Sequence, residues 1–336
     1  MIKNFLKENP IHRKIVPNFD LLFLFRPTMF FAIWLMIAIG MYLYSLHINE
    51  SPQWIFVFDF WTFIFFTGIT LVIGATLINN QIDDIEIDKL NNKLFILNNS
   101  IDITLAKKIH FISLVIGMFL LLLVNIYIFV IGIVIFIFWD KLYNDKKFAW
   151  KKNPVLGPLC NVVVGLLLII SGWIFVLSNG KYFFYSDKIL SVDFFIAIVP
   201  YILSYLAVIL LTDIPDIEGD KKYNKITFAI KYSVEITLII STILVIAAFI
   251  IALLLYDPLS STSIICSMPF FIYACLRQQK RDILRAIRYP IFILNFFTIT
   301  IYPYLCIACG VVYFISKYYY WHRFDLHYPT FLVEND

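Results

Sequence analysis

Two short segments of the chain concentrate carboxylate side chains. Residues 80–88 read Asn-Gln-Ile-Asp-Asp-Ile-Glu-Ile-Asp and residues 213–220 read Asp-Ile-Pro-Asp-Ile-Glu-Gly-Asp, and together they hold eight of the 23 acidic residues. Carboxylate oxygens are the ligands that hard cations such as Mg²⁺ prefer, and Mg²⁺ in proteins usually shares its coordination shell with substrate phosphates. The two segments are therefore candidates for a site that binds a phosphate compound through metal ions.

Each segment carries three oxygen-bearing side chains at helical spacing: Asn80, Asp84 and Asp88 in the first, and Asp213, Asp216 and Asp220 in the second. The first set drifts by only about 80° around a helix, and the second set returns to within about 20° of its starting point. Each set can therefore present its oxygens as one stripe. Facing stripes would hold two or more Mg²⁺ ions that bridge a diphosphate, so we predict all six residues as metal ligands and catalytic residues.

The rest of the chain is suited to lipid. Apolar residues make up 61% of the 336 positions, only 15% are charged, and the mean hydropathy is +0.84, whereas a soluble domain is about 45–50% apolar and 25% charged. A spanning helix needs roughly 20 mostly apolar residues. The sequence predicts nine such helices, at about 21–46, 54–78, 105–124, 126–142, 155–178, 192–212, 234–256, 262–276 and 289–316.

Residues 109–139 form one apolar run that is too long for a single crossing and short for two. Two crossings, with a turn near Asn125 and the N-terminus inside, place 23 of the 27 lysine and arginine residues on the inner side. A single crossing would move the basic group at 141–152 to the outer side. Because basic residues gather in inner loops, we predict a hairpin here and a cytoplasmic N-terminus.

The predicted fold is an all-α, polytopic membrane protein with nine transmembrane helices around a central cavity. Residues 1–20 form a cytoplasmic N-terminal segment, 21–316 a single nine-helix domain, and 317–336 an extracytoplasmic C-terminal tail. Residues 1–19 lack the cleavage-site pattern of a removable signal peptide. The net charge of +4 is explained by the basic inner loops, so it gives no reason to expect a nucleic-acid partner.

A diphosphate site also needs positive charge that does not depend on a metal. The inner loop 143–152 carries four lysines, and Arg26 stands just before Pro27 at the start of the first span. Lysine acts on phosphate as a point charge, and arginine acts as a planar fork. Membrane topology by itself also places basic residues at inner helix ends, so their presence alone assigns no role.

Two other classes of protein would also carry acidic residues in a membrane domain. Ion and proton transporters use them along their pathways, but here both acidic segments lie at helix ends on one side, and Asp59 lies near the outer end of its span. A non-catalytic scaffold would not require two matched stripes. The Cys306 and Cys309 pair lies inside the ninth predicted span, where small packing residues are expected, so we assign it no redox role.

At these residues the sequence resembles the UbiA superfamily of intramembrane prenyltransferases, and within it the homogentisate prenyltransferase and chlorophyll synthase branch. The resemblance covers about residues 20–316. The first family motif, Asn-x-x-x-Asp-x-x-x-Asp, begins at Asn80, and the second, Asp-x-x-Asp-x-x-x-Asp, begins at Asp213. Tyr143, with Lys151 eight residues later, resembles the family's inner loop, and Arg26 with the following proline resembles its N-terminal Arg-Pro.

The resemblance implies a Mg²⁺-dependent transfer of a prenyl group from a prenyl diphosphate to an aromatic, quinone- or chlorin-type acceptor within the membrane. Lys151, Tyr143 and Arg26 would bind the substrate diphosphate, and the active site would open on the cytoplasmic side. The same fold could instead cyclise or hydrate an isoprenoid. Departures from the family wording at 91–100, Asn144 and Ala149 leave the acceptor and the prenyl chain length open, and the oligomeric state is also open.

Overall fold

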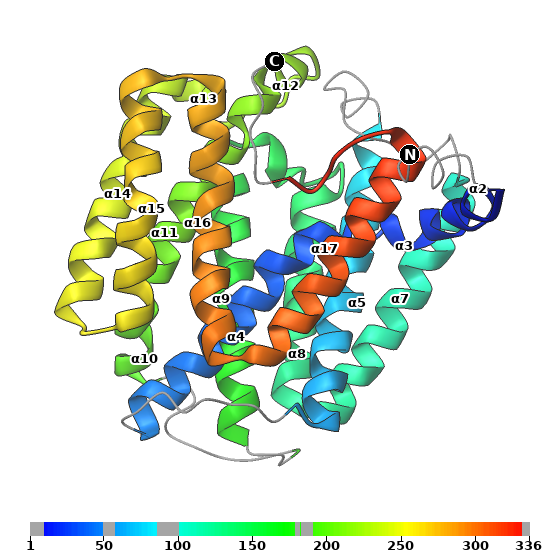
Figure 1. Cartoon of the computed structure of the whole chain (residues 1–336), viewed down its shortest axis with the longest axis horizontal. Helices are drawn as coiled ribbons and strands as arrows, with labels where there is room; N and C mark the ends of the chain where they lie inside the picture. Colours follow the sequence, from blue (N-terminus) through cyan, green and yellow to red (C-terminus); the bar gives the residue numbers. More distant parts are fainter. Residues whose placement is uncertain (1–9, 50–57, 86–100, 179–181, 183–190, 331–336) are drawn as a thin grey trace.

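The computed structural model describes residues 10–49, 58–85, 101–178, 182 and 191–330 (Figure 1). Every regular element in this part of the chain is helical. The α-helices are α2 (Pro10–Ile15), α3 (Asp20–Phe23), α4 (Phe30–Asn49), α5 (Phe60–Asp83), α7 (Ile103–Val124), α8 (Ile126–Phe136), α9 (Leu156–Ser178), α10 (Val192–Ala197), α11 (Val199–Thr212), α12 (Ile217–Lys222), α13 (Phe228–Tyr232), α14 (Val234–Leu254), α15 (Pro258–Arg277), α16 (Lys280–Ile301) and α17 (Pro303–Phe324).

Nine helical stretches among the described residues are long and apolar enough to cross a membrane. They are Pro27–Leu46, Phe60–Asp83, Ile103–Val124, Ile126–Asn144, Leu156–Ser178, Val192–Lys222, Val234–Leu254, Pro258–Arg277 and Lys280–Ile301. The predicted all-α, polytopic fold class is therefore confirmed. The first stretch begins later than the predicted residue 21, because Arg26 has a left-handed backbone (φ 50°) and separates the short helix α3 from the turn that starts at Pro27.

The hairpin predicted within residues 109–139 is confirmed. α7 ends at Val124 and α8 begins at Ile126, so the single residue Asn125 connects them in an extended conformation (φ −167°, ψ 139°). The Asn125 side-chain oxygen accepts a hydrogen bond from the Tyr127 N–H at 2.9 Å. This is a typical N-cap, which satisfies one of the amide donors that a helix start leaves without a partner.

The helix α4 is the most buried of the nine candidate spans. In Figure 1 it lies with α9 between a group formed by α14, α15 and α16 and a group formed by α5, α7 and α8. A Cβ atom added at Gly40 of α4 would lie well inside 3.0 Å of the Ile169 carbonyl oxygen, and one added at Gly172 of α9 would lie equally close to the Ile37 carbonyl oxygen. The two glycines therefore allow the backbones of α4 and α9 to approach directly, as small residues do in membrane helix pairs.

The ninth predicted span, 289–316, is wrong. The chain turns at Tyr302, which has a non-helical backbone (φ −120°, ψ 77°), and Pro303 starts a separate helix, α17. Proline lacks the N–H needed to continue a helix and disfavours helical geometry in the residue before it. In Figure 1, α16 descends and α17 returns to the end of the bundle where α3 lies.

The predicted extracytoplasmic tail at 317–336 also differs from the structure in its described residues. Residues 317–324 belong to α17, and the end of this helix contacts the N-terminal segment that was predicted on the opposite side. Buried Asp20 accepts a hydrogen bond from the Tyr319 hydroxyl at 2.5 Å and forms an ion pair with the Arg323 guanidinium at 2.9 Å. The two described ends of the chain therefore lie at the same end of the bundle.

Replacing Gly172 by alanine should destabilise the protein, because the added methyl group pushes α9 away from α4. Overpacking of this kind costs about 1–3 kcal/mol, so we expect the melting temperature of the detergent-solubilised protein to fall by several degrees. Gly310 of α17 is the matched control, because a methyl group there meets no atom within 4 Å. An equal fall for Gly172→Ala and Gly310→Ala would contradict the direct α4–α9 contact.

Candidate active site

The first carboxylate segment begins on the last turn of α5. This helix continues to Asp83, five residues beyond the predicted end at 78, and Asp84 is its C-cap, whose N–H donates to the Asn80 carbonyl oxygen at 3.0 Å. The Gln81 amide donates to the Leu24 carbonyl oxygen at 2.7 Å and so fixes this end of α5 to the N-terminal segment. Asp88, the third predicted ligand, lies outside the described residues.

The second carboxylate segment is not one continuous helix. Asp213 is the C-cap of α11, Asp216 ends the 3-10 turn that starts at Ile214, and Asp220 lies within α12. Pro215 explains the interruption, because it cannot donate the hydrogen bond that would continue α11. The three residues therefore lie on three successive short elements, and Asp220 is buried at 1% exposure.

A lysine from a distant part of the chain reaches the first segment. The Lys151 ammonium donates to the Asp84 carboxylate at 2.7 Å. Ala149 has a left-handed backbone (φ 45°) and begins the 3-10 turn that carries Lys151. The other lysines of this loop, Lys146, Lys147 and Lys152, are exposed, whereas Lys151 is buried. The structure therefore distinguishes Lys151 from the lysines that only mark an inner loop.

A second lysine pairs with the second segment, and the sequence did not single it out. The Lys225 ammonium lies 3.1 Å from the Asp220 carboxylate. Burial alone would lower the pKa of Lys225, but the nearby charges of Tyr143, Asp213 and Asp220 outweigh it and raise the pKa above its usual value. Lys225 therefore stays protonated. Its one available signal in the sequence was its position, five residues after Asp220.

Tyr143 lies between the two carboxylate segments. Tyr143 lies near Lys225 and Asp213 on one side and near Asp84 on the other. It also hydrogen-bonds to the Asn161 side chain. Tyr143 thus lies near one carboxylate of each segment, and Lys151 pairs with the one in the first segment. Arg26 lies near Tyr320 on α17, and its role in binding the diphosphate stays a prediction.

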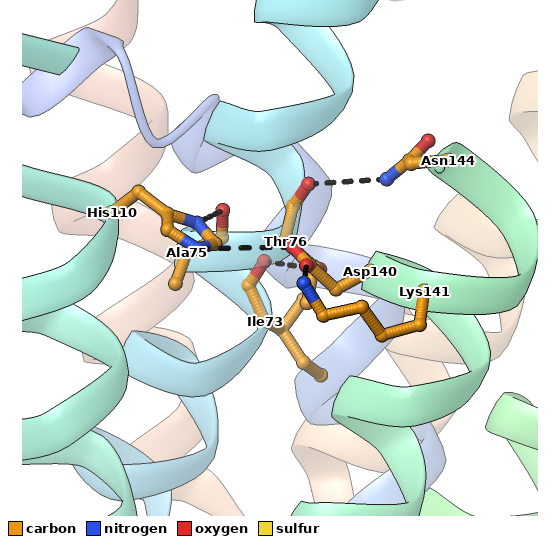
Figure 2. A network of polar contacts seen from close by, with 7 residues as sticks. All are labelled: Ile73, Ala75, Thr76, His110, Asp140, Lys141 and Asn144. Carbon is orange, nitrogen blue, oxygen red and sulfur yellow. Dashed lines mark hydrogen bonds and ion pairs between the residues drawn. The ribbon is translucent and has the colours of Figure 1, made fainter. Parts of the chain in front are cut away.

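A polar network that the sequence analysis missed supports the end of α5 (Figure 2). α8 continues as a π-helical segment, Ile137–Asn144, which carries buried Asp140. The Asp140 carboxylate lies 3.1 Å from the Lys141 ammonium and 3.9 Å from His110 Nε2, while His110 Nδ1 contacts the Ala75 carbonyl oxygen at 2.8 Å. The Asn144 amide donates to the Thr76 carbonyl oxygen at 3.5 Å.

This network contacts α5 at Ala75 and Thr76, about one turn before Asn80. Asp140 also lies near Asp83 at the end of the helix. π-helical turns inside α-helices occur frequently at functional sites. An ionisable residue near the end of a predicted span was the signal that could have identified Asp140, because such residues are costly in a membrane and are usually functional. We interpret the network as a support for the first carboxylate segment.

The donor atoms of the site suit Mg²⁺ bound together with a phosphate. Within the described residues, no three Asp, Glu, His or Cys side chains converge closely enough to hold a metal ion by themselves. The predicted ligands offer only oxygen atoms, and Mg²⁺ is typically held by one or two carboxylates with the remaining positions filled by substrate phosphate and water. The residues therefore fit an ion that arrives with its diphosphate.

A helical membrane bundle that pairs carboxylates with lysines at one end is typical of intramembrane enzymes that act on phosphorylated apolar substrates. The sequence model of the UbiA prenyltransferase family matches residues 33–296, and the chain belongs to this family. The match ends within α16, so α17 lies beyond it.

Similar proteins agree with this assignment. A 2-acylphloroglucinol 4-prenyltransferase of Humulus lupulus is 26% identical over 206 residues, which cover 57% of this chain and 47% of the relative. The chain thus spans about half the length of this curated relative.

Two solved structures share the fold. A digeranylgeranylglyceryl phosphate synthase is 23% identical with a TM-score of 0.58, and the alignment covers 85% of this chain and 97% of that one. A UbiA homologue from Archaeoglobus fulgidus bound to GPP and Mg²⁺ is 15% identical with a TM-score of 0.61, covering 87% and 99%.

Lys151→Met should lower the melting temperature, because it leaves the Asp84 carboxylate without its ammonium partner in a largely buried place. A buried polar group that loses its partner costs about 1–3 kcal/mol. Lys152→Met, on the exposed neighbour, is the matched control and should change little. The double variant Lys151→Met/Asp84→Asn should recover most of the loss. A double variant no more stable than Lys151→Met would contradict the ion pair as the cause.

Proposed function

We propose that this chain is a Mg²⁺-dependent prenyltransferase that transfers a prenyl group from a prenyl diphosphate to a hydrophobic or aromatic acceptor within the membrane and releases diphosphate. The observation that carries the proposal is that each carboxylate segment has a lysine paired with one of its carboxylates, Lys151 with Asp84 and Lys225 with Asp220. Membership of the UbiA family supports it. The name of the plant relative, which describes prenylation of an acylphloroglucinol, favours an aromatic acceptor.

Two lysines give the proposed site a positive charge of its own. Lys151 and Lys225 each neutralise a carboxylate in the structure, at 2.7 Å and 3.1 Å. In the substrate complex each ammonium would contact a phosphate oxygen instead, and Asp84 and Asp220 would then be available to hold Mg²⁺. We assign the same role as ligands to Asn80, Asp88, Asp213 and Asp216. The number of bound ions in this proposal is two or more.

The chemical step breaks the bond between the allylic carbon and the diphosphate oxygen, and the electron pair stays on that oxygen. Bound Mg²⁺ would act as a Lewis acid toward the charge that develops there. Lys151 and Lys225 stabilise the same charge from fixed positions, which is usually the largest contribution to catalysis of this kind. The acceptor supplies the electron pair of the new bond and releases a proton.

We place the site on the cytoplasmic side, because the basic residues gather at its end of the bundle. The predicted topology put Lys317 and Arg323 outside, but α17 returns the described residues 317–324 to the end that carries α3. Only Lys181 and Lys188, between the fifth and sixth spans, then remain on the outer side by sequence. This distribution follows the positive-inside rule more closely than the predicted one.

Asp84→Ala and Asp216→Ala should lower prenyl transfer by roughly 100-fold or more, because each removes a carboxylate that would hold the Mg²⁺ acting on the developing diphosphate. The measurement is product formation by mass spectrometry, with the protein in lipid vesicles and a panel of prenyl diphosphates and aromatic, quinone-type and chlorin-type acceptors.

Asp102→Ala is the matched control for these variants. Asp102 is exposed and caps α7 through the Thr104 N–H at 3.0 Å. Full turnover by Asp84→Ala or Asp216→Ala would refute the metal site. A product without acceptor atoms would identify cyclisation or hydration instead of transfer.

Removal of divalent cations should stop turnover. We expect excess EDTA to abolish product formation and added Mg²⁺ to restore it, with Ca²⁺ restoring less because it prefers longer bonds and more ligands. The measurement is the initial rate against the concentration of each cation at constant ionic strength. An unchanged rate in EDTA would contradict the proposed role of Mg²⁺.

A further inference from the structure

A narrow apolar cavity of about 60 Å³ lies between α4, α11, α14, α15 and α16. α4 lines it with a stripe from Ala32 to Ile39, and α11 lines it with a stripe from Tyr201 to Val208. The residues of each stripe recur at three- and four-residue spacing, which corresponds to one face of a helix. The cavity is therefore a channel that runs along these helices.

One end of this channel adjoins the candidate active site. Tyr205 of α11 lines the cavity and lies near Tyr143. Tyr143 in turn lies between the two carboxylate segments. Beyond Tyr205, the α11 stripe continues through Val208 toward Asp213 at the C-cap of the helix. An apolar chain attached to a diphosphate at Asp213 would therefore enter this channel directly.

The other end of the channel is closed by a cluster around buried Asp257, the N-cap of α15. Its carboxylate accepts hydrogen bonds from the Tyr42 hydroxyl at 2.8 Å, the Tyr201 hydroxyl at 2.7 Å and the Ser260 hydroxyl at 2.8 Å. The Leu259 N–H donates to the same carboxylate at 3.0 Å. Leu259 and Ser260 therefore hold the Asp257 carboxylate at the start of α15, and the carboxylate in turn fixes the hydroxyl ends of both tyrosines.

These residues stand where the channel would otherwise continue. Tyr42 follows the last lining residue of α4, Ile39, by three positions, and Ser260 precedes the lining residue Ser263 of α15 by three positions. Tyr201 lines the channel and lies twelve residues before Asp213, which corresponds to about 18 Å along α11. The cluster thus ends the channel at a fixed distance from the active site.

A second and larger cavity, of about 230 Å³, lies beyond the cluster between α4, α15 and α16. Tyr42 lines it, together with Phe297 and Ile301 of α16. Phe297 follows Leu294, which lines the first channel, by one turn of α16. The two cavities therefore follow one another along α4 and α16, and Tyr42, which lines the second cavity, comes one turn of α4 after Ile39, which lines the first.

We propose that Tyr42, positioned by Asp257, is a specificity-determining residue that limits the length of the prenyl chain of the donor. The inference rests on the proposed function, because the chain in the channel is taken to be the prenyl tail of the diphosphate bound at the carboxylate segments. Removing the Tyr42 ring joins the channel to the second cavity and admits a longer tail.

The test compares kcat/KM for prenyl diphosphates of increasing length, in five-carbon steps, with one acceptor in lipid vesicles. Tyr42→Ala should shift the preferred donor by at least one five-carbon unit, with the ratio of long to short donor rising about 10-fold or more. Tyr44→Ala is the control on the same helix, because Tyr44 points to another face and contacts Trp173. It should leave the preferred length unchanged.

A second variant decides the matter if Tyr42→Ala does not fold. Ser204→Leu adds an apolar group to the channel wall, one turn of α11 closer to the active site than Tyr201. It should therefore lower the turnover of the longer donors more than that of the shortest one. An unchanged length profile in either folded variant overturns the inference, and it would indicate that a lipid chain occupies the channel. No turnover of any prenyl diphosphate by the wild-type protein would instead refute the proposed function.

Discussion

An ionised side chain inside a membrane protein needs a partner of opposite charge, because leaving water costs each ion several kcal/mol. The architecture of the end of the bundle that carries the candidate site follows from this constraint. Asp84, Asp220 and Asp140 are each paired with a lysine at 2.7–3.1 Å. Only the Lys151–Asp84 pair joins distant parts of the chain, whereas the other two pairs are local. The Lys151–Asp84 pair therefore fixes the loop after α8 to the end of α5, and in the proposed function the same charges would bind the diphosphate.

The sequence was sufficient for the class of fold, because length and hydropathy determine whether a helix can span a membrane. Basic loop charges also resolved the hairpin at Asn125, which hydropathy alone left ambiguous. The α16–α17 boundary was missed because the apolar run continues through Tyr302 and Pro303, so hydropathy gives no signal there. The proline was the local indication of a break, and the Asp20 contact that holds α17 joins residues 303 positions apart.

The candidate site was only partly accessible from the sequence. Spacing singled out the two carboxylate segments, because side chains on one helix face obey a fixed period. Lys225 and the His110–Asp140 contact could not be found in this way, since they depend on how separate helices pack. The same holds for Asp257. In the sequence it looks like an ordinary loop residue, but in the structure its carboxylate accepts hydrogen bonds from hydroxyl groups on three different helices.

The contact between Asp20 and α17 has a consequence for the biogenesis of the protein. The Tyr319 partner of Asp20 is 299 residues further along the chain, and contacts of such long range form late. During synthesis the first helices enter the membrane long before α17 has been made. Asp20 therefore cannot yet contact Tyr319 and Arg323 at that stage. Within the described residues, the contact that fixes α3 therefore forms only after α17 has been made and has packed against it.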